Sequence, residues 1–161
     1  MSYYLATQNE WFFYTQKIME NFNIPFEIGQ DYENWEFDLE IMDNERIPNY
    51  DSYLYIGEVK NHLNLFSDKT ELIFYWDRLE AVILTFFHIE MNTIEKIKNI
   101  LKYKCHFPIY EIHSNYEVYE YYTGEIQIFL VLKKPNTLLV IYGNSTSLEG
   151  IKSNVLEEIL D

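Results

Sequence analysis

The stretch EIQIFLVLKKPNTLLVIY, residues 125–142, contains two apolar runs separated by a short polar segment. Both runs are rich in residues that favour strands, and the Lys-Lys-Pro-Asn between them is typical of a turn. We therefore expect an antiparallel hairpin made of residues 125–132 and 137–142, with residues 133–136 as its turn. This hairpin predicts that the fold is built on an antiparallel sheet.

Further short runs of β-branched and aromatic residues are also predicted to be strands. They are residues 51–59, 63–66, 71–76, 109–113 and 116–122, with a turn at residues 67–70. The run at residues 79–89 fits either a helix or a strand, and its β-branched and aromatic content favours a strand. Hairpin connections between most of these strands predict a meander.

Three segments have the apolar spacing of amphipathic helices. A helix over residues 8–21 begins with a capping box, and Asn92 is the expected N-cap of a second helix over residues 93–104. A third helix begins near Ser147 and extends toward the C-terminal end of the sequence. The predicted fold class is α+β: an antiparallel β-sheet meander with three α-helices (N-terminal, central and C-terminal) packed mainly on one face.

The composition indicates a single domain spanning residues 1–161, because the chain has no linker, low-complexity tract or internal repeat. Its only cysteine, Cys105, cannot form an intramolecular disulfide, which fits a reducing compartment. The N-terminal residues lack a signal-peptide pattern, and no apolar run approaches the ~20 residues that span a bilayer. We therefore expect a cytoplasmic protein.

The net charge is −14 and is unevenly distributed along the chain. Residues 1–58 contain 12 acids against Lys17 and Arg46, a balance of −10, whereas residues 59–161 contain 14 acids and 10 bases, a balance of −4. Such a surface repels nucleic acid and anionic membrane and attracts a basic protein partner. The alternative is that the acidity serves only to keep the protein soluble.

Acidic and apolar residues alternate from Trp35 to Ile41, which predicts a half-buried strand with carboxylates in a row on its outer face. A second acidic and aromatic segment at residues 116–125 could extend that surface. Basic side chains of a partner would bind such carboxylates through charge-assisted hydrogen bonds, and tyrosines would add interface contacts. The predicted partner-binding residues are Asp31, Glu33, Glu36, Asp38, Glu40, Asp43, Glu117, Tyr119, Glu120 and Tyr121.

No motif in the sequence indicates catalysis. The five glycines do not form a phosphate-binding loop, and Cys105, His106 and His113 are too few for a structural zinc site. A Cys105 nucleophile with a histidine base has no supporting motif either. We therefore expect no catalytic residues, no cofactor and no metal, and hence a protein that is not an enzyme.

Size, acidity and the lack of catalytic motifs together predict an acidic inhibitory binding protein. The form we favour is an immunity protein that neutralises a cognate basic, nuclease-type toxin by occluding its active site. One alternative is a phage anti-defence protein that mimics nucleic acid and blocks a host nuclease. Another is a small-ligand-binding module or an enzyme with a pocket between the sheet and the helices.

Overall fold

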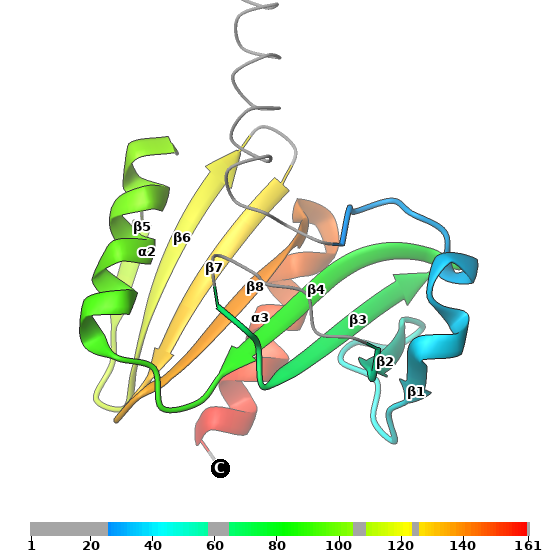
Figure 1. The fold of residues 1–161 in the computed structure, drawn as a ribbon, viewed down its shortest axis with the longest axis horizontal. Coiled ribbons are helices and arrows are strands. Elements are labelled where there is room, and N and C mark those ends of the chain that lie inside the picture. The colour runs from blue at the N-terminus through cyan, green and yellow to red at the C-terminus, as the bar shows by residue number, and fades with distance from the viewer. Residues whose placement is uncertain (1–25, 58–64, 105–108, 124–125, 161) are drawn as a thin grey trace, which may run out of the picture.

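The computed structural model of the chain describes residues 26–57, 65–104, 109–123 and 126–160. Within these residues, eight strands form one sheet (Figure 1). The strands are β1 Leu39–Ile41, β2 Asp51–Tyr55, β3 Lys69–Tyr75, β4 Arg78–Phe86, β5 Ile109–Ile112, β6 Tyr116–Thr123, β7 Ile126–Lys133 and β8 Thr137–Asn144. The described helices are two short 3₁₀ helices, η1 Tyr32–Asn34 and η2 Glu36–Asp38, and two α-helices, α2 Met91–Lys104 and α3 Ser145–Leu160.

The strands lie in the order β1-β2-β3-β4-β8-β7-β6-β5, and all neighbours are antiparallel. The prediction of one meander is therefore wrong. Two four-stranded meanders lie side by side, and the last strand of each, β4 and β8, pair at the centre of the sheet. Local hairpins explain the pairing within each half, whereas the central pair joins segments that α2 and three strands separate in sequence. The sheet edges are β1 and β5 (Figure 1).

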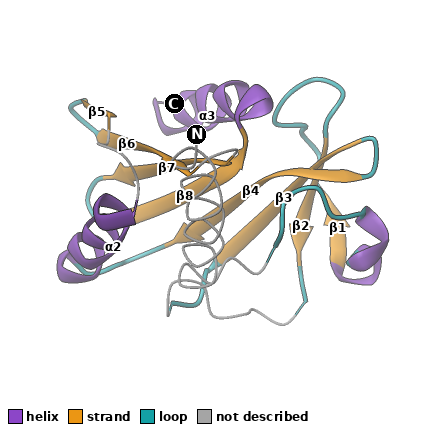
Figure 2. Cartoon of the chain, turned by 90° about the horizontal axis from the view of Figure 1, so that it is seen from above, coloured by secondary structure: helices purple, strands orange, loops and turns teal. Residues whose placement is uncertain are grey.

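The two described α-helices cover opposite faces of the sheet (Figure 2). The core on the α2 face includes Ile94, Ile97 and Leu101 of that helix, and the core on the α3 face includes Leu148, Ile151 and Val155. The prediction of three helices mainly on one face is therefore wrong, because the central strands are apolar on both faces and both need cover. The predicted helix over residues 8–21 lies outside the described residues.

The ambiguous run at residues 79–89 is a strand as far as Phe86 and forms most of β4. Val82 and Leu84 belong to the core on the α2 face, whereas Ile83 belongs to the core on the α3 face. A strand that is buried on both faces is apolar at almost every position. This explains why the sequence showed no two-residue period there.

Other predicted elements are present with shifted ends. The helix predicted over residues 93–104 is α2, but it begins at Met91, and the amides of Thr93 and Ile94 bond to the carbonyl oxygen of Glu90 at 3.0 and 3.1 Å. Asn92 is therefore inside the helix rather than its N-cap. The strand predicted over residues 63–66 is not seen: residues 65 and 66 lie outside the named strands, and residues 63 and 64 lie outside the described ranges.

No helix in the described part of the chain is long and apolar enough to cross a membrane.

The predicted strand from Trp35 to Ile41 is wrong over most of its length, because η2 occupies residues 36–38 and only Leu39–Ile41 pair as β1. Aromatic packing explains the difference. The ring centroids of Tyr32 and Trp35 lie 5.5 and 6.1 Å from that of Phe74 in the core. Two residues three positions apart can both face the core on a 3₁₀ turn but not on a strand. Glu36, Asp38 and Glu40 therefore do not form a regular row.

Candidate partner-binding surface

One end of the sheet, around the edge strand β1, has a concentration of exposed carboxylates. Their positions are set by η1, η2, β1 and the segment between β1 and β2. They are Asp31, Glu33, Glu36, Asp38, Glu40, Asp43 and Glu45, and we refer to them as the acidic lobe. Within the described residues, Asp31 pairs with Arg78 at 3.2 Å, and no other member of the lobe has an ion pair.

Large apolar side chains are exposed among these carboxylates. Phe37 lies between Glu36 and Asp38 and is 91 % exposed, and Ile41 of β1 is 72 % exposed. Neighbouring carboxylates repel one another, and the exposed benzyl and sec-butyl side chains of Phe37 and Ile41 gain nothing from water. Both features are unfavourable in the isolated protein and become favourable when a surface with cationic and apolar groups covers them. Six of the predicted partner-binding residues, Asp31 to Asp43, thus lie at one exposed end of the molecule.

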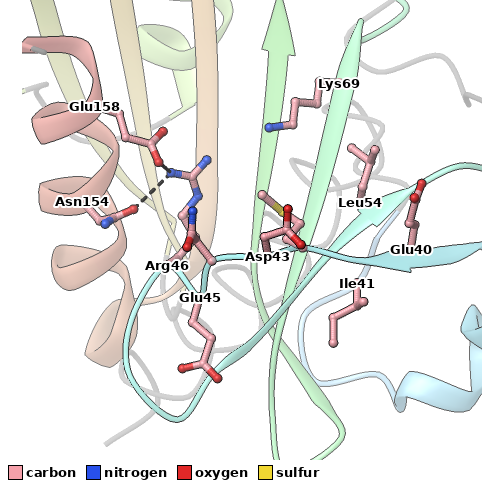
Figure 3. Close-up of a pocket in the computed structure, with 11 residues that line it drawn as sticks. Glu40, Ile41, Asp43, Glu45, Arg46, Leu54, Lys69, Asn154 and Glu158 are labelled. Carbon is pink, nitrogen blue, oxygen red and sulfur yellow. Dashed lines mark hydrogen bonds and ion pairs between the residues drawn. The ribbon is translucent and has the colours of Figure 1, made fainter.

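A buried ion pair anchors the segment that carries Asp43 and Glu45. Arg46 donates two hydrogen bonds to the carboxylate of Glu71 on β3, at 2.8 and 2.9 Å, and one to Oδ1 of Asn154 on α3 at 3.1 Å. Lys69 contacts Oε1 of the Glu71 carboxylate at 2.7 Å. Arg46 and Glu71 are 8 % and 2 % exposed, respectively. The anchor joins the acidic lobe to the sheet through Glu71 and to α3, and Figure 3 shows Arg46 beside Asn154 and Glu158 of α3.

The contacts of the anchor keep both of its buried groups charged. Burial alone would raise the pKa of Glu71, but hydrogen bonds and positive charge from Arg46 and Lys69 outweigh burial and hold this pKa below its usual value. Burial alone would lower the pKa of Arg46, and its bonds to Glu71 and Glu158 outweigh that effect and raise it. A buried charged pair of this kind fixes the geometry of the surface segment above it.

A polar depression of about 430 Å³ lies beside the anchor. Its lining includes Glu40, Asp43, Leu54, Lys69 and Glu158, and Figure 3 shows their side chains around it. None of the described residues that line it is a histidine, cysteine, serine, threonine or tyrosine, so this lining offers no thiol or hydroxyl nucleophile and no imidazole base. The depression lies on the α3 side of the sheet, not under α2. Its carboxylates suit the binding of a cationic group.

A second feature of this end of the molecule is the tip of the β3–β4 hairpin, which the sequence analysis missed. Trp76 and Asp77 form a two-residue turn, and both have positive φ, 48° and 59°. Such turns favour Asn-Gly, because a Cβ in the left-handed region costs about 1–2 kcal/mol per residue. Trp76 is also 82 % exposed. The sequence did contain a signal for this turn: two strand-like runs meet at Trp-Asp, although this dipeptide lacks the Asn or Gly that such turns favour.

Converting this turn to Asn-Gly should stabilise the protein. We expect the Trp76→Asn, Asp77→Gly variant to gain about 1–2 kcal/mol in the free energy of unfolding, since both residues then tolerate positive φ. Thermal unfolding followed by circular dichroism measures the gain. Trp76→Ala keeps a Cβ in the left-handed region and should gain much less. A lower melting temperature in the Asn-Gly variant would mean that the Trp76 side chain stabilises the fold.

The second predicted patch lies near the other edge of the sheet, on β6, with five strands between it and β1. The hydroxyl of Tyr119 donates to Glu117 at 2.8 Å and accepts from Lys98 of α2 at 3.0 Å. Glu120 accepts a hydrogen bond from the buried Gln127. Tyr121 is 1 % exposed and belongs to the core on the α2 face. The two patches therefore do not form one continuous surface. In the second patch, Tyr119 already has a cationic partner, Lys98.

Of the remaining candidates for catalysis or metal binding, the structure describes only His113. Cys105 and His106 lie outside the described residues. His113 is exposed after β5, where its ring stacks on Tyr116 with centroids 4.4 Å apart and its Nε2 lies 3.4 Å from Glu111. These contacts account for His113 as a residue that packs on its neighbours at the edge of the sheet, without requiring a catalytic or metal-binding role.

The sequence matches no protein-family model and no curated protein. Among solved structures, the fold resembles a GTP-binding regulator from Thermotoga maritima, with 15 % identity, a TM-score of 0.44 and coverage of 78 % of this chain and 84 % of that one. It also resembles a cysteine-rich secretory protein from Staphylococcus aureus, with 9 % identity, a TM-score of 0.46 and coverage of 75 % of this chain and 46 % of that one. Neither resemblance bears on the function of this chain.

Proposed function

We propose that this protein is an acidic inhibitory binding protein that covers the functional surface of a basic protein. The observation that carries the proposal is Phe37, which is 91 % exposed between Glu36 and Asp38, two carboxylates that have no ion pair within the described residues. The particular form we propose is an immunity protein for a nuclease-type toxin, acting in the cytoplasm, where the free thiol of Cys105 would stay reduced.

The two kinds of side chain would contribute to different steps of binding. The negative field of the acidic lobe would attract a basic partner and raise the association rate about 10- to 10³-fold at low salt. Once the surfaces meet, Phe37 and Ile41 would be removed from water and slow dissociation. A nuclease is a suitable target, because its active site carries the cations that bind nucleic-acid phosphates.

The alternative of nucleic-acid mimicry receives less support. Mimicry of a phosphate backbone requires carboxylates at regular intervals, and η2 interrupts the strand that would have supplied them. The acidic lobe offers charge without that regularity. A partner would therefore recognise it as a protein surface of complementary charge and shape, and not as a substitute for a nucleic-acid strand.

Charge reversal within the acidic lobe should test this proposal. The purified chain is used as bait in an extract of its native host, and the captured protein is identified and purified. The Glu36→Lys, Asp38→Lys variant should associate with that protein about 10-fold or more slowly at low ionic strength, because it loses attraction and adds repulsion. Stopped-flow measurements at several salt concentrations give the rates, and the difference should shrink as salt rises.

The matched control, Glu111→Lys with Glu157→Lys, changes the net charge by the same amount at exposed sites outside the lobe. It should change the association rate less than about 3-fold. The captured protein should be basic, and the wild-type chain should inhibit its enzymatic activity in a 1:1 complex. An acidic captured protein, an uninhibited activity, or an equal effect of both variant pairs would refute the proposal.

A further inference from the structure

Three aromatic side chains meet at the tip of the β3–β4 hairpin. The rings of Tyr50 and Tyr75 are stacked, with centroids 4.7 Å apart and an interplanar angle of 27°. Trp76 is perpendicular to Tyr75, with centroids 6.3 Å apart and an angle of 89°. All three line a pocket of about 660 Å³, which is large enough for a long side chain. Stacked and perpendicular rings form a corner of aromatic surface that is open to solvent.

Two carboxylates also line this pocket. Asp51 and Asp77 are both exposed, and none of the described residues that line the pocket is a lysine or arginine. The nearest arginine in the sequence, Arg78, already binds Asp31 and the carbonyl oxygen of Gly29. The pKa of Tyr50, which lines the pocket, is raised by burial and by the neighbouring Glu80 and Tyr75.

We propose that this aromatic corner binds the guanidinium group of an arginine side chain or the ammonium group of a lysine. Electron-rich ring faces attract cations, and tryptophan does so most strongly. The carboxylates of Asp51 and Asp77 add direct charge attraction at the rim of the pocket. An anionic ligand such as a nucleotide would be repelled by the same carboxylates, and a purely apolar ligand would gain nothing from them.

The backbone supports a role in binding. Asn49, Trp76 and Asp77 all have positive φ although none is a glycine. These residues belong to the two segments that line the pocket, so unfavourable backbone conformations concentrate there. The backbone amide of Tyr32 bonds to the carbonyl oxygen of Asp77 at 2.7 Å and holds the tip in place. The corner is therefore formed before a ligand arrives.

The natural occupant of the pocket follows from the proposed function, on which this part of the inference rests. A basic protein that docks on the acidic lobe would present arginines and lysines at this end of the molecule. One such side chain inserted between Trp76 and the two carboxylates would act as the anchor of the interface, while the lobe attracts the surrounding charges.

The binding of a cation can be tested without the partner. The probe is the peptide acetyl-Gly-Arg-Gly-Arg-Gly-amide, and its control contains citrulline, a neutral isostere, in place of both arginines. Titrations of the full chain are followed by the indole N–H signal of Trp76 in nuclear magnetic resonance spectra, which is assigned by its loss in Trp76→Asn. We expect the arginine peptide to bind at least 10-fold more tightly than the citrulline peptide.

Variants localise the binding. The affinities of the variants are measured by isothermal titration calorimetry, because Trp76→Asn has no indole signal at this position. Trp76→Asn should weaken the binding of the arginine peptide at least 5-fold, and it should not unfold the protein, because asparagine tolerates the positive φ of this position. The double variant Asp51→Asn, Asp77→Asn should weaken the binding of the arginine peptide about 3-fold. The matched control is Phe87→Ala, which removes an exposed aromatic residue at the opposite end of β4, where its amide bonds to Asp68. This control should leave the affinity unchanged.

Equal binding of the arginine and citrulline peptides would overturn the proposal, and so would an unchanged affinity in Trp76→Asn. The result is separable from the test of the proposed function. If the arginine peptide binds at Trp76 but no basic protein is captured, the pocket stands and the inhibitory function is wrong. If a basic protein is captured and inhibited but the arginine peptide does not bind at Trp76, the proposed function is supported and the proposed cation site is refuted.

Discussion

Replacing Glu71 with alanine should lower the free energy of unfolding by about 3 kcal/mol, because it leaves the charge of Arg46 buried without its main partner. Glu71 accepts both hydrogen bonds of the guanidinium fork, and Arg46 is only 8 % exposed. The remaining contact with Glu158, whose side chain is 60 % exposed, compensates for part of the loss. Urea unfolding of the wild type and Glu71→Ala measures the change.

Two controls show whether the loss of stability comes from leaving a buried charge without its partner. Asp31→Ala removes a carboxylate whose pair with Arg78 is 61 % exposed on both sides, and it should cost less than about 1 kcal/mol. The double variant Arg46→Met, Glu71→Leu removes both buried charges and should recover most of the stability lost in Glu71→Ala. If Glu71→Ala costs no more than Asp31→Ala, the anchor does not hold the acidic segment in place.

The same carboxylate gives stability a predictable pH dependence. The folded protein lowers the pKa of Glu71 from its ordinary value of 4.5, so the unfolded chain binds a proton at this group more readily than the folded chain. The contribution of Glu71 is therefore complete above pH 4.5 and is lost as the pH falls below it. In Glu71→Ala, stability should fall less steeply below pH 4.5 than in the wild type.

The elements that local sequence determines were predicted, and their arrangement was not. Strands β7 and β8 and helix α2 follow from apolar runs and spacing within the segments themselves. The apolar stripe of α3, which includes Leu148 and Val155, shows that the helix covers a core. It does not show which face of the sheet it covers. That choice depends on strands such as β3, where Leu72 faces one core and Ile73 the other, and where both are fully buried.

The candidate surface was predicted in composition but not in shape. Alternation between Trp35 and Ile41 indicated a strand with Phe37 facing inward, yet Phe37 is exposed, because Tyr32 and Trp35 occupy the available core. No local pattern reveals that competition for space. Arg46 did have a signal: it is the first base after the acids at residues 27–45, and its partner Glu71 lies 25 positions away in sequence.

Replacing Gly143 with alanine should lower the free energy of unfolding by about 2–4 kcal/mol, because the new methyl group would collide with backbone. Gly143 of β8 pairs with Ala81, beside a bulge in β4: Ile73 pairs with Ala81 and Phe74 with Leu79, which leaves Glu80 without a partner on β3. A Cβ at position 143 would overlap the carbonyl oxygen of Glu80 and lie 2.8 Å from Cα of Ala81. Urea unfolding of the purified variant measures the loss.

Gly150 provides the matched control, because its added Cβ would meet only a side-chain methyl group, Cγ2 of Ile47, at 3.2 Å. A side-chain methyl can move by a few tenths of an ångström, and alanine is about 1 kcal/mol better than glycine inside a helix such as α3. Gly150→Ala should therefore be neutral or stabilising. Adding Ala81→Gly to Gly143→Ala removes one close contact but not the carbonyl oxygen, so it should restore little. A Gly143→Ala variant as stable as the wild type would contradict this prediction. It would mean that the bulge at Glu80 is easily displaced, so that β4 and β8 can separate locally at the centre of the sheet.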